Sequence, residues 1–368
     1  MMLSRIFTNL TSLNPLNFIF LILGFLILNL NVLKLMWDLE RSNSKLTPCE
    51  MKTRLTLDHL VTKDWVYKYE SYSGGVVVPG WLPNASRDIN DYLPKNNLSF
   101  LVTPKNIDPS TELLILIKTR VINKEARSRI RNSWYRLLMR LHSRSKIIFV
   151  LGRNGSNWSI PELSDEIEGY GDILVGNFID TYYNLTLKLV SAFEFTLNTE
   201  WKPKIVVTVD DDMFINVPVF LRKIKDLNSN CEGPYLLGYT GANYQPLVDN
   251  SNNKNIRKWG VPPYLASSNQ SFPPYTHGAM VIMSFETVEC IYKEAFNLPF
   301  FHIDDAFITG FCPYRCGIRP VQLENMQLGS INQQRFNVSS YIVSRINNYD
   351  IFRIHNDIIN YYNLTHIT

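Results

Sequence analysis

The sequence predicts an α/β sandwich with a mostly parallel central sheet, placed behind an N-terminal membrane anchor. Two observations predict the sandwich. Apolar runs of strand length alternate with segments of helical periodicity, and residues 205–212 form a β-branched strand that ends in three aspartates. An apolar stretch near the N-terminus predicts the anchor. Because ligands bind at the carboxyl edge of the strands in open α/β sheets, we expect the functional site at the aspartates.

The charge balance argues against nucleic acid as a partner. The chain of 368 residues holds 37 basic and 33 acidic residues, for a net charge of +4. No basic tract of the kind that marks nucleic-acid binding accompanies this balance. The length allows one large domain or two ordinary ones.

The apolar stretch over residues 16–33 is about as long as a helix that crosses a bilayer, and Lys34 and Trp37 can anchor its far end. A cleaved signal peptide is the alternative, but no small-x-small site follows, which favours a retained anchor. Residues 38–110 carry scattered Pro, Asn, Ser and Gly without a period, as expected of a stem. The expected order is a cytosolic tail over 1–15, a transmembrane signal anchor over 16–36, a lumenal stem over 37–111 and a folded domain over 112–368.

Glycosylation triplets and cysteines support a lumenal location for the folded domain. Triplets of the form Asn-x-Ser/Thr begin at Asn84, Asn97, Asn154, Asn157, Asn184, Asn269, Asn337 and Asn363. The five cysteines are Cys49, Cys231, Cys290, Cys312 and Cys316. In an oxidising compartment disulfides are expected, and if Cys49 belongs to the stem, the other four allow three pairings. A zinc site at residues 312–316 is disfavoured, because no second pair of Cys or His ligands accompanies it.

Strands and helices alternate from residue 113 onward. Apolar runs predict strands over 113–117, 147–151, 173–175, 205–209 and 279–283. Apolar residues spaced three and four apart predict helices over 127–141, 185–197 and 285–296. Asn216 and Pro218 open a further helix, as a cap residue and an early-turn proline do.

Two acidic groups are candidates for chemistry. The adjacent carboxylates of Asp210, Asp211 and Asp212 repel one another, and a hard cation such as Mg²⁺ or Mn²⁺ would neutralise them. A solvated acidic turn is the alternative. Asp304 and Asp305 stand between apolar residues, where they suit either a helix start or a proton-accepting site.

These segments together resemble the β1,3-glycosyltransferases, the group that includes β1,3-galactosyltransferases and β1,3-N-acetylglucosaminyltransferases. Residues 126–134 (Ala-Arg-Ser-Arg-Ile-Arg-Asn-Ser-Trp) resemble the family's Arg-x-x-Ile-Arg-x-Thr-Trp. Residues 177–188 (Asn-Phe-Ile-Asp-Thr-Tyr-Tyr-Asn-Leu-Thr-Leu-Lys) are similar to its Asp-Phe-x-Asp-x-Tyr-x-Asn-Leu-Thr-Leu-Lys. The triplet at 210–212 and the acid pair at 304–305 follow in the same order. The resemblance covers residues from about 112 to 325.

The resemblance implies a GT-A nucleotide-sugar-binding domain in a single-pass type II membrane protein of the Golgi apparatus. The implied reaction transfers a hexose or N-acetylhexosamine from a UDP-sugar to a glycoprotein or glycolipid glycan, with inversion and a divalent metal, usually Mn²⁺. Asp305 is implied as the catalytic base. The remaining implied site residues are Asp210, Asp211, Arg127 and Arg131 for the donor, and Asp212 and His355 for the metal. A structural salt bridge is the alternative for the two arginines, and a packed core histidine for His355.

This sequence departs from the family near the chemistry. Thr208 stands where the family has Lys, Asp304 where it has Glu, and residues 276–281 (Thr-His-Gly-Ala-Met-Val) where it has Cys-x-Gly-x-Gly-Tyr. Met280 therefore adds bulk at a family glycine. These changes leave open a catalytically inactive lumenal binding protein or chaperone on the same fold. A receptor-like ectodomain is a third reading, but it does not explain the carboxylates.

Overall fold

The computed structural model describes residues 85–93, 100–155, 160–240, 247–248, 258–261, 272–331, 335–340, 342–346 and 350–366. The expected tail and anchor, and most of the expected stem, lie outside these residues. Within the described part, no helix combines the length and the apolar content that crossing a membrane requires.

A mixed sheet of eight strands forms the centre of the described fold, in the order β1-β4-β3-β2-β5-β10-β7-β11. The strands are β1 (Phe100–Val102), β2 (Leu113–Lys118), β3 (Ser145–Arg153), β4 (Ile173–Ile179), β5 (Ile205–Asp210), β7 (Leu236–Thr240), β10 (Thr276–Ser284) and β11 (Pro320–Gln322). The four central strands β4, β3, β2 and β5 run parallel. In contrast, β10 pairs antiparallel with both β5 and β7. The prediction of an α/β fold with a large, mostly parallel sheet is confirmed.

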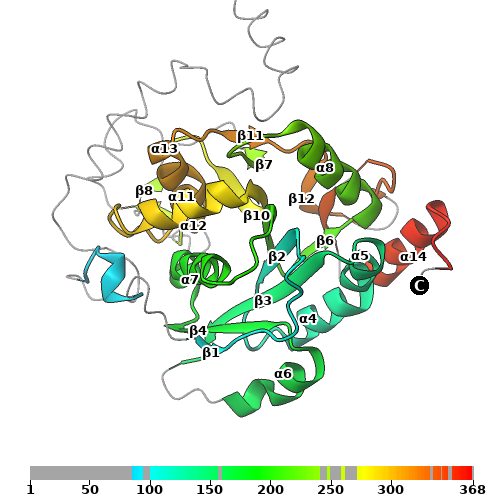
Figure 1. The fold of residues 1–368 in the computed structure, drawn as a ribbon, viewed down its shortest axis with the longest axis horizontal. Helices are drawn as coiled ribbons and strands as arrows, with labels where there is room; N and C mark the ends of the chain where they lie inside the picture. Colours follow the sequence, from blue (N-terminus) through cyan, green and yellow to red (C-terminus); the bar gives the residue numbers. More distant parts are fainter. Residues whose placement is uncertain are drawn as a thin grey trace, which may run out of the picture. The chain divides into compact units, whose positions relative to one another are not determined.

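Helices cover both faces of this sheet (Figure 1). The helices are α4 (Lys124–Ile130), α5 (Arg136–Leu141), α6 (Ser164–Tyr170), α7 (Leu185–Leu197), α8 (Val217–Asn230), α11 (Phe285–Ala295), α12 (Asp304–Ala306), α13 (Cys312–Arg315) and α14 (Ile351–Tyr361). Helix α7 packs on β3 and β4, and α11 packs on α7. Apolar side chains from alternate positions of the strands join these two helices in one core. Because α7 is enclosed by the sheet and α11, its residues 186–196 are all buried, including the charged side chains of Lys188 and Glu194.

The helix predicted over 127–141 is divided in the structure. A five-residue π-helical segment, Arg131–Tyr135, separates α4 from α5, and Ser133 within it has non-helical backbone angles. The Ser133 hydroxyl donates to the carbonyl oxygen of Arg129 at 2.7 Å. Such back-bonding by serine bends helices, which explains the kink. Periodicity predicted the buried face, including Trp134 and Leu138, but not the interruption.

A second sheet continues directly from the acid triplet. Its strands are β6 (Met213–Ile215), β12 (Met326–Ile331) and β13 (Val343–Ile346), in the order β12-β13-β6. A two-stranded ladder joins β8 (Leu247–Val248) and β9 (Gly260–Val261). Because β6 begins one residue after Asp212, the triplet is a tight link between two sheets.

Residues assigned to the stem contribute to this fold. Strand β1 pairs with β4, and Ile89 and Leu93 lie in the hydrophobic core. A 3₁₀ turn over Ile89–Asp91, capped by the Asp88 carboxylate, holds these two side chains inward.

The cysteine pairing and one glycosylation triplet are defined by the structure. Cys290 of α11 and Cys316, just after α13, form a disulfide. Cys231 and Cys312 are free thiols, and Cys49 lies outside the described residues. Asn184 is buried, and its amide donates to the carbonyl oxygen of Ile179 at 2.7 Å. Its triplet is therefore structural in the folded protein, whereas Asn337 and Asn363 are exposed.

Candidate active site

A cavity of about 890 Å³ lies where β2 and β5 end, next to α12. Its wall includes all three aspartates of the triplet together with Asp304 and Asp305. The parallel register of β2 and β5 brings the last residues of the two strands side by side, with Lys118 opposite Asp210. The structure therefore assembles acids that are nearly a hundred residues apart in the sequence.

Each carboxylate of the triplet has a different partner. Asp210 accepts from the Lys118 ammonium at 2.9 Å. Asp211 accepts from the Thr119 hydroxyl at 2.5 Å and from the Asn123 amide at 2.8 Å. Asp212 lies 3.0 Å from the guanidinium of Arg345 on β13. Partial burial raises the pKa of Asp212 against the effect of Arg345, and the charges of its two neighbours add to the rise.

The acid pair lies at the start of α12, after Ile303. The side chain of Asp304 is buried and lies 3.6 Å from the Lys118 ammonium. Burial, followed by the charge of Asp304, raises the pKa of Asp305 to about 8, against Lys118 and a backbone hydrogen bond from Gly278. A carboxylate with a pKa near neutral pH in a cavity wall is suited to accept a proton from a substrate hydroxyl.

Lys118 is the site residue that the sequence reasoning missed. It ends an otherwise apolar strand, and its side chain is only 5% exposed. A lysine that closes a run of five buried apolar residues is itself a signal, because a buried ammonium needs acidic partners. Finding those partners required the register between β2 and β5, which the sequence does not state.

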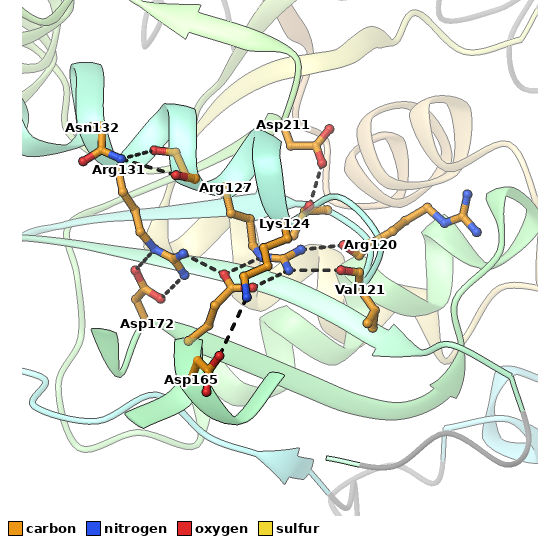
Figure 2. A network of polar contacts seen from close by, with 12 residues as sticks. Arg120, Val121, Lys124, Arg127, Arg131, Asn132, Asp165, Asp172 and Asp211 are labelled. Atoms are coloured by element: carbon orange, nitrogen blue, oxygen red, sulfur yellow. Dashed lines mark hydrogen bonds and ion pairs between the residues drawn. The ribbon is translucent and has the colours of Figure 1, made fainter. Parts of the chain in front are cut away.

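The structure does not bring Arg127 or Arg131 to the cavity. Figure 2 shows both arginines in a network of polar contacts, with Arg131 against Asp172. Both arginines also pair with the buried Glu166 of α6. The remaining N–H groups of Arg127 donate to the carbonyl oxygens of Arg120 and Val121. In this structure the two arginines therefore do not contact the site of the nucleotide-sugar, contrary to the prediction. Their bonds instead hold the loop between β2 and α4.

His355 is likewise separated from Asp212. It lies on α14 and lines a different cavity of about 430 Å³, together with Asn132 and Arg136. Helix α14 turns Ile354 and Ile358 inward, which sets the side of the helix on which His355 lies. Burial lowers the pKa of His355 to about 4, so the ring is neutral near pH 7. The predicted pairing of His355 with Asp212 on one metal ion is not what this structure shows.

The donor set at the triplet fits a hard cation in chemistry but does not enclose one. Carboxylate oxygens are the ligands that Mg²⁺ and Mn²⁺ prefer. In the described part of the chain, no three side chains of Asp, Glu, His or Cys are grouped so that they could hold a metal ion. Asp212 is the most exposed ion-paired carboxylate of the triplet, with 53% of its side chain exposed. A cation at this carboxylate would have to take its other ligands from water or from a bound substrate.

Comparison with known proteins places this site within a family. The family model described as Galactosyltransferase matches residues 125–324, which is more than half of the chain and includes both the triplet and the acid pair. The chain belongs to the galactosyltransferase family. Lys118 and His355 lie outside the matched span.

Curated relatives agree with this family. Beta-1,3-galactosyltransferase 1 of Homo sapiens is 30% identical over 211 residues, which are 57% of this chain and 62% of the relative. N-acetyllactosaminide beta-1,3-N-acetylglucosaminyltransferase 4 of Mus musculus is 28% identical over 253 residues, 68% of this chain and 70% of the relative. The chain thus spans less than two thirds of the first relatives it matches. Among solved structures, mouse xyloside xylosyltransferase 1 in its apo form covers 65% of this chain and 98% of its own, at 11% identity and a TM-score of 0.33, too low to carry an argument.

The glycine segment that departs from the family pattern is divided between cavity and core. His277, Gly278 and Ala279 line the cavity. Met280 is fully buried on β10 opposite Val209 and is not among the cavity's lining residues. The extra bulk at this family glycine is therefore packed into the protein interior and leaves the cavity open.

Two exposed aromatic rings form part of the cavity wall. The Trp259 indole donates to the Tyr182 hydroxyl at 2.6 Å, and the Lys258 ammonium lies 4.6 Å and 4.4 Å from the ring centroids of Tyr182 and Trp259. Each of these two aromatic residues, Tyr182 and Trp259, is 40% exposed. Trp134, by contrast, is 1% exposed and belongs to the core, so its ring is not available for contact with a sugar as those of Tyr182 and Trp259 are.

Proposed function

We propose that this member of the galactosyltransferase family is an inverting glycosyltransferase that moves a hexose or N-acetylhexosamine from a UDP-sugar to a glycan hydroxyl. The observation that carries the proposal is the Asp305 carboxylate, which lines the same cavity as the acid triplet and has a pKa raised to about 8. Formation of a β1,3 linkage is supported by the names of the relatives, a beta-1,3-galactosyltransferase and a beta-1,3-N-acetylglucosaminyltransferase.

In the proposed reaction, Asp305 takes the proton of the acceptor hydroxyl as that oxygen attacks the anomeric carbon of the donor, and UDP leaves. Such positioned proton transfer contributes about 10²–10⁴-fold to a rate. Asp210 and Asp211 would contact the donor, with Asp211 kept in place by Thr119 and Asn123. The aromatic rings of Tyr182 and Trp259 offer faces for a pyranose ring.

A divalent cation, Mn²⁺ or Mg²⁺, is part of the proposal, with Asp212 as its protein ligand. When bound, the cation would neutralise charge on the diphosphate of the leaving UDP. Its other ligands would come from the diphosphate and water, since His355 lies in another cavity. Residues of the chain perform the remaining tasks: they hold the donor, orient the acceptor and accept the proton.

We further propose a GT-A domain that works in the Golgi lumen as part of a single-pass type II membrane protein. The central sheet with helices on both faces and the acids at its strand ends support a GT-A domain. The Cys290–Cys316 disulfide supports an oxidising compartment. The apolar stretch at residues 16–33 supports the anchor.

The test is a transfer assay on the purified lumenal part, residues 37–368, with Mn²⁺, a panel of UDP-sugars and galactose- or N-acetylglucosamine-terminated acceptors. We expect turnover with UDP-galactose or a UDP-N-acetylhexosamine, and a rate that rises with pH as Asp305 loses its proton around pH 8. Asp305→Asn is expected to lower kcat by about 10²-fold or more, because the amide cannot accept the proton.

The controls separate the metal from the base. Asp212→Asn and a chelator are both expected to weaken UDP binding in calorimetry, whereas Asp305→Asn leaves it near the wild-type value. If wild type and Asp305→Asn give the same background rate with every donor, the inactive binding protein is the better reading. UDP binding that withstands the chelator would remove Asp212 from the metal role.

A further inference from the structure

The Lys118 ammonium is a junction between the two acidic groups of the cavity. Its nitrogen lies 2.9 Å from Asp210 Oδ1, 2.9 Å from the carbonyl oxygen of Gly278 and 3.6 Å from Asp304 Oδ2. The contacts with Asp210 and Gly278 are hydrogen bonds, and the longer contact with Asp304 is an ion pair. Because its side chain is only 5% exposed and its ammonium is held by these contacts, we expect any effect of Lys118 on chemistry to pass through its partners.

These partners come from three different elements. Asp210 ends β5, Gly278 lies on β10, and Asp304 opens α12. Gly278 contacts both sides of the junction, because its carbonyl accepts from Lys118 while its N–H bonds to Asp305. The Lys118 ammonium therefore links the end of β5, which carries Asp210, to the α12 segment, which carries Asp304 and Asp305.

We propose that Lys118 is a positioning residue of the active site, whose single buried positive charge holds the Asp304–Asp305 pair in place and keeps Asp305 able to act as a base. This inference rests on the proposed function for its catalytic part, since it concerns the base of that reaction. It adds a residue that lies outside the span matched by the family model.

The charges around Asp305 give the direction of the effect. Burial and the neighbouring charges of Asp304 and Asp210 raise the pKa of Asp305, whereas Lys118 and the Gly278 N–H lower it. Lys118 is itself held in the charged form: burial lowers its pKa, but Asp210, Asp304 and Asp305 outweigh burial and raise it well above the usual value. Loss of the ammonium therefore leaves a higher pKa on Asp305 and less deprotonated base at neutral pH.

A second buried lysine provides a matched control. Lys188 of α7 is 1% exposed and also lies at the end of β2, where it pairs with Asp180 at 2.9 Å and donates to the carbonyl oxygen of Thr119. In the described part of the chain, Lys188 forms no ion pair or hydrogen bond with Asp304 or Asp305. Replacing Lys188 removes the same type of buried charge without removing the counter-charge of the base.

The experiment compares Lys118→Met, Lys118→Arg and Lys188→Met in the pH dependence of kcat/KM, with Mn²⁺ and the donor and acceptor found in the transfer assay. For Lys118→Met we expect the acid limb of the profile to move up by about one pH unit or more, which is about a tenfold loss of rate at pH 7. Lys118→Arg keeps the charge and is expected to keep the wild-type position of the limb. Lys188→Met can lower the rate by disturbing the loop at Thr119, but the acid limb of its kcat/KM profile is expected to stay at the wild-type pH.

A second variant tests whether the effect passes through Asp304. The charge of Asp304 is the largest contribution after burial to the raised pKa of Asp305. Adding Asp304→Asn to Lys118→Met removes that charge, so the acid limb of the double variant is expected to move back toward lower pH. If the acid limb of the double variant stays at the same pH as that of Lys118→Met, Lys118 does not act on Asp305 through this pair.

A measurement without turnover keeps the inference independent of the proposed function. The carboxyl carbons of aspartate are labelled with ¹³C, and the resonance lost in Asp305→Asn is titrated in wild type and in the lysine variants. We expect this resonance to titrate near pH 8 in wild type and at higher pH in Lys118→Met only. If it moves equally in Lys188→Met, or in neither, the inference is overturned. Absence of turnover in wild type would instead count against the proposed function, while the titration still decides the role of Lys118.

Discussion

At the scale of single residues, the site depends on the absence of a side chain at Gly278 as well as on its charged groups. Gly278 lies between Asp305 and Lys118, and a Cβ there would overlap the Asp305 carboxylate and come within 2.8 Å of the Lys118 nitrogen. Its backbone is not left-handed, so the constraint is the room for a side chain. The sequence showed a glycine retained from the family pattern, but only the structure shows that the base and its counter-charge occupy the place of the missing side chain.

We therefore expect Gly278→Ala to displace the base. A shift of about 1 Å in a catalytic group costs on the order of 10²-fold in rate, so kcat/KM in the transfer assay is expected to fall by about that factor. The matched control is Gly169→Ala, because a Cβ at Gly169 in α6 meets nothing within 4 Å and alanine favours a helix. A Gly278→Ala enzyme with kcat/KM near the wild-type value would show that the cavity wall yields without moving Asp305.

At the scale of elements, apolar runs predicted the strands well, because strands buried on both faces read as continuous apolar sequence. The runs at 113–117, 147–151 and 205–209 became β2, β3 and β5. Other features depend on pairing partners that are distant in the sequence. The antiparallel β10 beside β5, and the second sheet that begins at Met213, follow from tertiary contacts and not from local pattern.

The same limit applies to the arginines of the α4 segment. Arg127 and Arg131 are four residues apart in the sequence, but their partners, Glu166 and Asp172, lie on segments whose placement the sequence does not give. Two arginines one turn apart suggest contact with phosphate, but the two buried acids beside them favour a structural ion-pair network. For Asp210, Asp211, Asp212 and Asp305, by contrast, the resemblance to the β1,3-glycosyltransferases implied one site, and the structure places all four on the wall of one cavity.

Glu166 is the centre of that network and gives a test of its role. Its buried carboxylate accepts from Arg127 at 2.7 Å and from Arg131 at 2.6 Å. Removing one member of a buried ion pair costs about 3–5 kcal/mol, because the remaining charge is left without compensation. We expect Glu166→Gln to lower the free energy of unfolding by about that amount in urea titrations.

The pH dependence of this effect has a definite sign. Burial raises the pKa of Glu166, but the hydrogen bonds and charges of the two arginines outweigh it and lower the net value. A lowered pKa in the folded state contributes stability above the pKa of the unfolded chain, about 4.3. The difference between wild type and Glu166→Gln should therefore shrink as the pH falls below about 4. Glu125→Gln is the control, since Glu125 is 93% exposed in its pair with Arg129 and such pairs contribute about 0.5 kcal/mol or less.

At the scale of the whole molecule, the disulfide and the base belong to one closed loop. The bond between Cys290 and Cys316 spans 26 residues and encloses α12 with Asp304 and Asp305, together with the buried π-helical segment Phe307–Phe311. The loop is fixed at one end on α11, which packs on α7, and at the other end after α13. The covalent bond thus restrains the part of the fold that carries the base, whereas the triplet is held by the sheet itself.

We expect the double variant Cys290→Ala, Cys316→Ala to lose about 3–4 kcal/mol of unfolding free energy, the value for closing a loop of this length in the unfolded chain. Urea titrations without reductant measure this loss, and reductant on wild type is expected to produce the same shift. Cys231→Ser is the matched control, because Cys231 is a partly exposed free thiol and surface substitutions usually change stability by less than about 0.5 kcal/mol. Because Asp305 lies inside the loop and the triplet outside it, the double variant is expected to lose kcat before it loses affinity for UDP. An unchanged urea midpoint in the double variant would show that packing of α11 and α13 alone holds the base segment.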